Sequence, residues 1–196
     1  MTTIDNFFES FRAAENIVYQ KVEKQYFNGQ FYSPLLIYKL AFDYNCGKFI
    51  LDYEIRVTLF NQPMVALGSQ GDRHLCSLQC CFAPANSIGE FEIEKRGLLQ
   101  MLFDRQPDRY PVIKSDDQEL HLSLSANATL NNLYKEVERF SEFSPSLTGK
   151  SDQGASNSYR ITVLFGAKQF HSDALHLAID FCKSMVAENA AASEDA

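Results

Sequence analysis

Hydrophobic and polar residues alternate almost without interruption from Lys48 to Phe60. One parity of this stretch is entirely apolar: Phe49, Leu51, Tyr53, Ile55, Val57 and Leu59. The other parity is mainly charged or polar, with Ile50 and Phe60 as the exceptions. A period of two with one polar face is typical of a half-buried strand in an antiparallel sheet.

The preceding segment predicts the partner of this strand. Leu36, Tyr38, Leu40, Phe42 and Tyr44 place apolar side chains at every second position. The connection Asn45-Cys46-Gly47 has the residue types that a tight turn requires. Residues 35–60 are therefore expected to form a β-hairpin.

The first segment, 4–27, is expected to be a helix that ends at Asn28-Gly29. Its apolar residues lie three or four positions apart: Ile4, Phe7, Phe8, Phe11, Ala14, Val18 and Val22. This stripe could also serve as a short coiled-coil seam. Three phenylalanines in the first turns favour packing on the protein's own sheet instead.

The rest of the chain predicts further strands and helices. Alternation predicts strands at 74–82, around 91–93, in a second hairpin over 110–125 with its tip near 115–118, and at 159–165. Helical spacing predicts helices at 98–103, 128–142 and 172–187. The segment 141–158 is rich in Ser and Gly and is expected to be a mobile loop.

Helices grouped around a run of hairpins indicate an α+β fold. The expected architecture is a mostly antiparallel sheet of about five to seven strands, packed with N-terminal, middle and C-terminal helices. Residues 1–187 are expected to form one domain, and residues 188–196 a disordered acidic tail.

The charge of the chain limits its partners. The 196 residues carry a net charge of −7, and residues 111–196 hold 12 acidic against 7 basic side chains. An acidic chain lacks the basic surface that displaces counterions from nucleic acids, and it disfavours anionic membranes as well. No apolar run is long enough to cross a bilayer.

Cysteine usage and the N-terminus predict a soluble, cytoplasmic protein. Five cysteines are an odd and low count for a disulfide-stapled secreted domain of this length. The first residues, Met-Thr-Thr-Ile-Asp, include neither the basic nor the apolar region of a signal peptide.

Two motifs resemble ligand sites in part. Thr148-Gly149-Lys150-Ser151 matches the end of a phosphate-binding loop, but Ser144 occupies the position of the first glycine and no strand is expected before it. His74, Cys76, Cys80 and Cys81 are soft metal ligands. On one strand, however, Cys76 and Cys80 are about 13 Å apart, so buried and inert cysteines are expected.

The densest group of potential acid–base residues lies near the expected hairpin tip: Asp116, Asp117, Glu119 and His121. On a strand, Glu119 and His121 would project from the same face, about 6–7 Å apart. With a carboxylate from elsewhere they could act as acid and base, or bind a hard cation. A solvated polar tip is the simpler interpretation. Cys46, in the first hairpin turn, is the most exposed candidate thiol.

These observations favour a non-catalytic module that binds a protein or a small ligand, without nucleic acid or membrane as partner. A sheet face or an exposed edge strand could receive a peptide. The alternative is a small hydrolase that uses Glu119 and His121, or Cys46. Residues 4–27 could also join copies of the chain into a homo-oligomer. No catalytic residue, metal ligand or cofactor is assigned, and no motif places the chain in a family.

Overall fold

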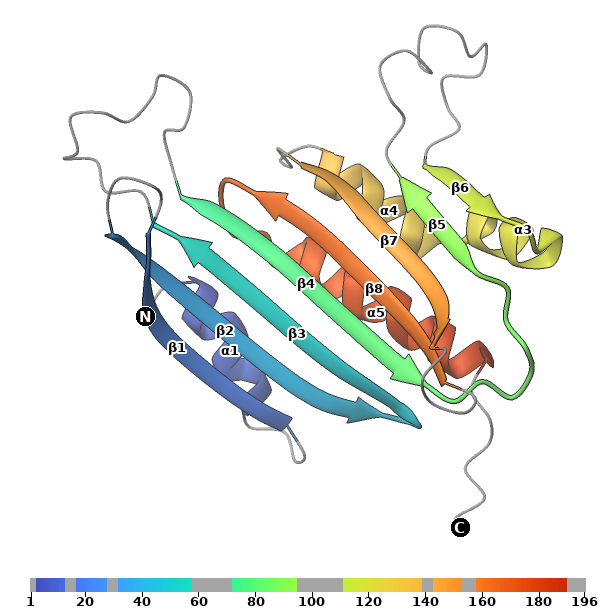
Figure 1. Cartoon of the computed structure of the whole chain (residues 1–196), viewed down its shortest axis with the longest axis horizontal. Helices are drawn as coiled ribbons and strands as arrows, with labels where there is room; N and C mark the ends of the chain where they lie inside the picture. Colours follow the sequence, from blue (N-terminus) through green and yellow to red (C-terminus); the bar gives the residue numbers. More distant parts are fainter. Residues whose placement is uncertain are drawn as a thin grey trace, which may run out of the picture.

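The computed structural model describes residues 3–12, 17–27, 32–57, 72–94, 111–138, 143–152 and 158–189. Its elements in chain order are α1 (Thr3–Arg12), β1 (Ile17–Phe27), β2 (Tyr32–Tyr44), β3 (Gly47–Arg56), β4 (Arg73–Phe82), β5 (Phe91–Glu94), β6 (Val112–Ser115), α3 (Gln118–Ala126), α4 (Ala128–Glu138), β7 (Phe143–Asp152), β8 (Ser158–Ala167) and α5 (Ser172–Asn189). The strands form one sheet in the order β1-β2-β3-β4-β8-β7-β5-β6 (Figure 1).

The predicted α+β class is confirmed. Every pair of neighbouring strands is antiparallel. Within the described ranges the sheet has eight strands and is accompanied by four helices. The expected number of strands was too low because β1 and β7 arise from segments that were predicted to be a helix and a loop.

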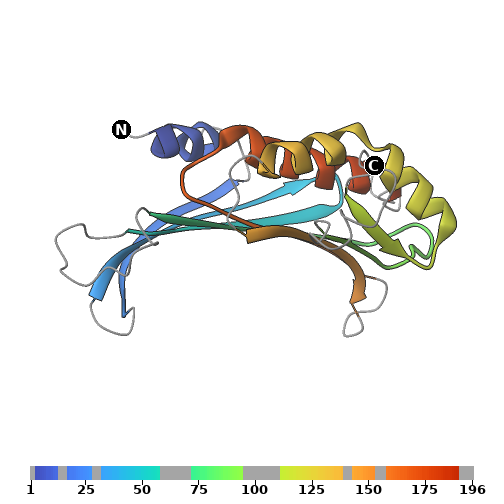
Figure 2. The same ribbon diagram turned by 90° about the horizontal axis from the view of Figure 1, so that it is seen from above.

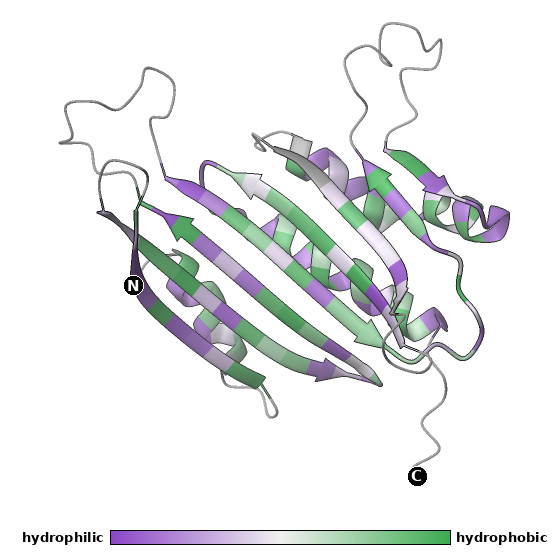
Figure 3. Ribbon diagram, viewed as in Figure 1, coloured by the Kyte–Doolittle hydropathy of each residue, from purple (hydrophilic) through white to green (hydrophobic). Residues whose placement is uncertain are grey.

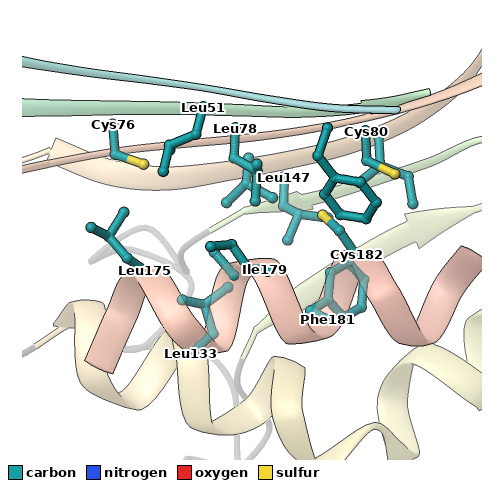
Figure 4. Close-up of a cluster of buried hydrophobic side chains, with 14 of the residues drawn as sticks. Leu51, Cys76, Leu78, Cys80, Leu133, Leu147, Leu175, Ile179, Phe181 and Cys182 are labelled. Atoms are coloured by element: carbon teal, nitrogen blue, oxygen red, sulfur yellow. The ribbon is translucent and has the colours of Figure 1, made fainter. Parts of the chain in front are cut away.

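All four helices lie on the same side of the sheet (Figure 2). Side chains of the central strands that point to this side are buried, and those on the opposite side are half-buried or exposed. Figure 4 shows Leu51 and Leu78 of the sheet facing Leu175 and Ile179 of α5. The hydrophobic core therefore lies between the sheet and one helical layer. None of the described helices lies over the other face of the sheet, which is called the helix-free face.

The central hairpin is confirmed. Strands β2 and β3 pair from Leu35↔Arg56 to Tyr44↔Gly47. The turn between them consists of Asn45 and Cys46, and Asn45 has a φ of 52°. Asparagine tolerates this left-handed conformation better than most residues do, which explains the turn. The last residues of the predicted hairpin, 58–60, lie outside the described residues.

The first predicted helix is wrong over residues 17–27. Residues 17–27 form strand β1, which pairs along its whole length with β2. Val18 and Val22 fit a helical stripe, but β-branched and aromatic residues are frequent in this segment and favour a strand. Pairing with β2 decides between the two patterns. The predicted cap at Asn28-Gly29 lies outside the described residues.

Helix α1 packs on the sheet, as the sequence predicts. Phe8 is fully buried, and its ring stacks on that of Tyr38 with centroids 4.9 Å apart. Asp5 joins α1 to two strands, because its carboxylate accepts hydrogen bonds from Lys21 Nζ at 3.1 Å and the Tyr38 hydroxyl at 3.0 Å. The apolar stripe of α1 is thus used within the chain.

The second predicted hairpin is half wrong. Residues 112–115 form β6 and pair with β5, but residues 118–126 form helix α3. Asp117 caps this helix, because its carboxylate accepts a hydrogen bond from the Leu120 amide at 3.1 Å. An N-cap of this type satisfies an amide that a helix start leaves unpaired. This cap favours a helix over the strand that the alternating leucines predict.

The predicted loop at 141–158 is also wrong in its central part. Residues 143–152 form strand β7, which pairs with β8 on one side and β5 on the other. Gly149 is required because a Cβ atom there would overlap the Phe91 ring and the Tyr159 hydroxyl. Polar residues are tolerated in this strand because every second side chain points to the helix-free face of the sheet.

The remaining elements follow the predictions. Strands β4, β5 and β8 and helix α5 occupy the expected segments, and α4 runs from Ala128 to Glu138. Helix α5 continues to Asn189, so Glu188 and Asn189 belong to it rather than to the predicted tail. Residues 98–103, 139–142 and 190–196 lie outside the described residues. Among the described helices, none is long and apolar enough to span a membrane.

Candidate functional site

The helix-free face of the sheet is not covered by any described helix, and Figure 1 looks directly onto it. The strand register places Val18, Ala41, Ile50, Gln79 and Thr162 in one row across five neighbouring strands. Ile50 remains 48% exposed and Val18 68% exposed. Figure 3 shows the alternation of hydrophobic and hydrophilic residues along these strands. Ile50 therefore brings an apolar side chain to solvent near the middle of this face, and Val18 does so at its β1 edge.

A hollow of about 390 Å³ lies on the helix-free face where β3, β4 and β8 run side by side. It is lined by Asp52, Glu54, Arg56, Leu75, Ser77, Leu164 and Gly166, at strand positions that face this side, and by Cys76 and Phe165, whose side chains are buried in the core. Leu164 is 44% exposed. An apolar wall with a few charged groups is typical of sites that bind a ligand or a side chain of a partner.

The two ends of the helix-free face are basic. At one end the register sets Lys48, Arg160 and Lys150 on nearby strands, and at the other end Arg56 lies beside Arg73. Side chains described on this face include eight basic and five acidic residues: Lys24, Lys39, Lys48, Arg56, Arg73, Lys114, Lys150 and Arg160 against Asp43, Asp52, Glu54, Glu92 and Glu94. The described side chains of this face therefore do not account for the net charge of −7.

Ion pairs hold several of these charged side chains in place. Lys39 Nζ lies 3.3 Å from Asp52 Oδ1, and Arg56 Nη2 lies 3.4 Å from Glu54 Oε2. The Arg56 guanidinium also lies over the Tyr26 ring, 5.7 Å from its centroid. These pairs are partly exposed, so they contribute little to stability and instead orient charges around the hollow.

No family model, curated protein or solved structure matches the chain.

The structure separates the predicted acid–base pair. Glu119 and His121 lie on helix α3, where residues two apart point about 200° away from each other. Glu119 lines a hollow of about 290 Å³ between α3 and the end of α5, and His121 is not part of its lining. Glu119 and His121 therefore do not share the face that their use as an acid–base pair in a hydrolase requires. Asp116 is exposed, and Asp117 is engaged as the N-cap.

The predicted burial of Cys76 and Cys80 and the predicted exposure of Cys46 are confirmed. Cys76 and Cys80 lie on β4 and point into the core, as Figure 4 shows. Burial raises the pKa of the Cys80 thiol to about 12 and that of the Cys76 thiol further. Thiols with raised pKa values are poor nucleophiles and poor metal ligands. Cys46 is exposed in the hairpin turn, and its use by an enzyme stays a prediction.

The segment that resembles a phosphate-binding loop, 148–151, lies within β7. Its backbone amides are part of a strand ladder to β8. A phosphate-binding loop instead leaves its amides pointing at the ligand between a strand and a helix. The structure thus supports the interpretation of this match as a coincidence of residue types.

A buried polar pair next to α1, Tyr53 and His74, is not evident from the sequence. His74 is 7% exposed, and its Nδ1 atom lies 3.0 Å from the Tyr53 hydroxyl. Burial lowers the pKa of His74 below its usual 6.5 and raises that of Tyr53. The ring of Phe170, before α5, packs edge-on to Tyr53. Alternation predicted that both side chains face the core, but the contact between them depends on the register of β3 and β4.

The Tyr53–His74 pair predicts a pH-dependent stability. A buried histidine with a lowered pKa binds fewer protons in the folded than in the unfolded state. Protonation of His74 therefore does not lower the free energy of unfolding above about pH 6.5, but it does so as the pH drops below that value. Burial lowers the pKa of His171 in the same direction. We expect the free energy of unfolding, measured by urea titration, to decrease from about pH 7.5 to about pH 5.

The variant His74→Gln keeps a polar group at this position but does not titrate. We expect it to be less stable than the parent at neutral pH and to lose less stability on acidification. An equal pH dependence in the parent and the variant would mean that His74 is not the titrating group.

Proposed function

We propose that the protein is a non-catalytic binding module that holds an extended segment of another protein on the helix-free face of its sheet. The observation that carries this proposal is the hollow between β3, β4 and β8, with Leu164 at its wall and Ile50 nearby. Solvent-exposed apolar groups that share one surface are typical of interaction sites.

The charges of the face suggest the chemistry of the partner. Basic side chains lie at both ends of the strands, and the apolar positions lie between them. Complementary charge steers a partner and sets its register more than it adds affinity. A segment with one or two apolar residues flanked by Asp or Glu fits this arrangement best.

Panning a random-peptide phage library on the folded protein tests the proposal. We expect enriched peptides with an apolar centre and acidic flanks. The substitution Leu164→Glu places a charge in the hollow and should weaken their binding about tenfold or more in a fluorescence titration. The matched control is Leu122→Glu, because Leu122 is 60% exposed on α3, on the other side of the sheet.

Binding that is unchanged by Leu164→Glu but lost in Leu122→Glu would move the site to the helical layer. A library that yields no binder to the folded parent would argue against a peptide-binding face altogether. Circular dichroism spectra of both variants should match that of the parent, since both side chains are exposed.

A further inference from the structure

Strand β1 forms a long open edge of the sheet. It contains 11 residues, none of them buried, and within the described part of the chain it pairs only with β2. The opposite edge strand, β6, has 4 residues, and α3 packs next to it. Long edge strands with apolar side chains are templates for pairing with another chain, and proteins usually shorten or cover them.

We propose that β1 pairs antiparallel with β1 of a second copy of the chain, which joins two sheets into one. A two-fold axis perpendicular to the sheet relates antiparallel copies and keeps the helices of both on the same side. In an antiparallel pair, directly opposite residues point to the same side of the sheet. Their positions in β1 therefore differ by an even number, and the axis passes between the two copies of one residue. The residue that lies on the axis defines the register of the pairing.

The charges of β1 select the register. With Val22 on the axis, all 11 residues are paired, since Val22 is the midpoint of Ile17–Phe27. Lys21 then faces Glu23 of the partner subunit, and Glu23 faces Lys21 of the partner subunit. Opposite charges directly across an antiparallel pair are stabilising, whereas like charges are destabilising.

Neighbouring registers are unfavourable. An axis through Lys21 or Lys24 brings two ammonium groups together, and an axis through Glu23 brings two carboxylates together. Each of these shifts also leaves residues at the ends of β1 without a partner. Full overlap and charge complementarity thus coincide in one register.

The same register covers the exposed apolar residues at the ends of β1. Val18 is 68% exposed and Phe27 58% exposed. In the proposed pairing Val18 faces Tyr26 of the partner subunit, and Phe27 faces Ile17 of the partner subunit. Cross-strand pairs of aromatic and β-branched residues are among the more favourable ones in sheets.

Helix α1 leaves room for the second copy. Phe8 lies over Tyr38 of β2, so α1 sits inward from the edge. Two such helices across the joint would be about 14 Å apart, which corresponds to three strand spacings. Packed helices approach to about 8–10 Å, so the two copies of α1 do not collide. The helix-free faces of both copies would lie on one side, as one continuous surface.

Cysteine cross-linking tests the register. In a Cys46→Ser background, which removes the exposed thiol, we expect Val22→Cys to form a covalent dimer under mild oxidation, because this residue meets its own copy at the axis. The control Gln20→Cys should not cross-link, since the two introduced thiols would be about 13 Å apart. Equal yields of covalent dimer, or none in either variant, would overturn the proposed pairing.

A charge exchange gives a second test that does not depend on oxidation. Glu23→Lys alone and Lys21→Glu alone each place like charges across the joint, so each should be monomeric at 22.3 kDa by light scattering. The equimolar mixture restores opposite charges at both places and should elute at twice this mass, as the parent does. A monomeric parent, or a Glu23→Lys variant that remains dimeric, would contradict the proposal. Circular dichroism checks that Lys21→Glu, which loses its contact with Asp5, remains folded.

Discussion

Replacing Phe8 with alanine is expected to lower the free energy of unfolding by about 3–5 kcal/mol. The Phe8 side chain is fully buried between α1 and the sheet, and its ring contacts those of Tyr19, Tyr38 and Tyr53. Removing the ring leaves a cavity that the surrounding tyrosines cannot fill without moving. Urea denaturation followed by far-UV circular dichroism measures the change.

Phe27→Ala is the matched control, because it removes the same ring from a position that is 58% exposed. Its effect on the free energy of unfolding, measured on monomeric protein at low concentration, should stay within about 0.5 kcal/mol. If both variants were equally stable, α1 would not belong to the core, and its apolar stripe would be available for contacts between copies of the chain.

Replacing Gly149 with valine is expected to destabilise the fold by about 3 kcal/mol. The new side chain would overlap the Phe91 ring and the Tyr159 hydroxyl. Tyr159 in turn donates a hydrogen bond to the carbonyl oxygen of Gly89, at 2.7 Å, so it cannot move away freely. Thermal unfolding and urea titration of the variant measure this effect.

Thr148→Val is the control for Gly149→Val. Thr148 is the preceding residue of β7 and lies on the helix-free face, where a similar side chain is accommodated. Its effect should be within about 0.5 kcal/mol. A Gly149→Val variant as stable as this control would show that residues 143–152 are not held between β5 and β8.

The helix-free face and the β1 edge make separate predictions. Leu164→Glu should affect peptide binding without changing the mass of the assembly, because Leu164 lies on β8, four strands away from β1 in the sheet. Glu23→Lys should change the mass of the assembly and leave the hollow between β3, β4 and β8 intact. Failure of one proposal therefore does not decide the other.

Local patterns of apolar residues are sufficient to predict the elements whose periodicity is unambiguous. The hairpin of β2 and β3 follows from alternation on both sides of a turn, and α5 follows from apolar residues at helical spacing. Burial of one side of a strand or helix imposes these periods on any sequence that folds into it. For the same reason the inward orientation of Cys76 and Cys80 could be predicted.

Segments in which local signals conflict could not be predicted from their own pattern. The residues of β1 satisfy both a helical and a strand pattern, and pairing with β2 selects the strand. The polar segment of β7 has no core-forming pattern of its own, yet strands on both sides supply its hydrogen bonds. In α3, the cap at Asp117 prevails over alternating leucines. The strands that pair with β1 and β7 lie partly outside a local window, whereas Asp117 is only three residues from Leu120, so its cap is a local signal that competes with the alternating leucines.

The candidate site depends on tertiary structure for the same reason. Ile50, Leu75 and Leu164 come from strands far apart in the chain, and nothing in their local sequence distinguishes them from other half-exposed residues. The register of β3, β4 and β8 brings Leu75 and Leu164 to one hollow and Ile50 to the same face, and the placement of every described helix on the other side leaves that hollow open. Sequence alternation predicts which residues face away from the core, but only the strand order determines which of them meet.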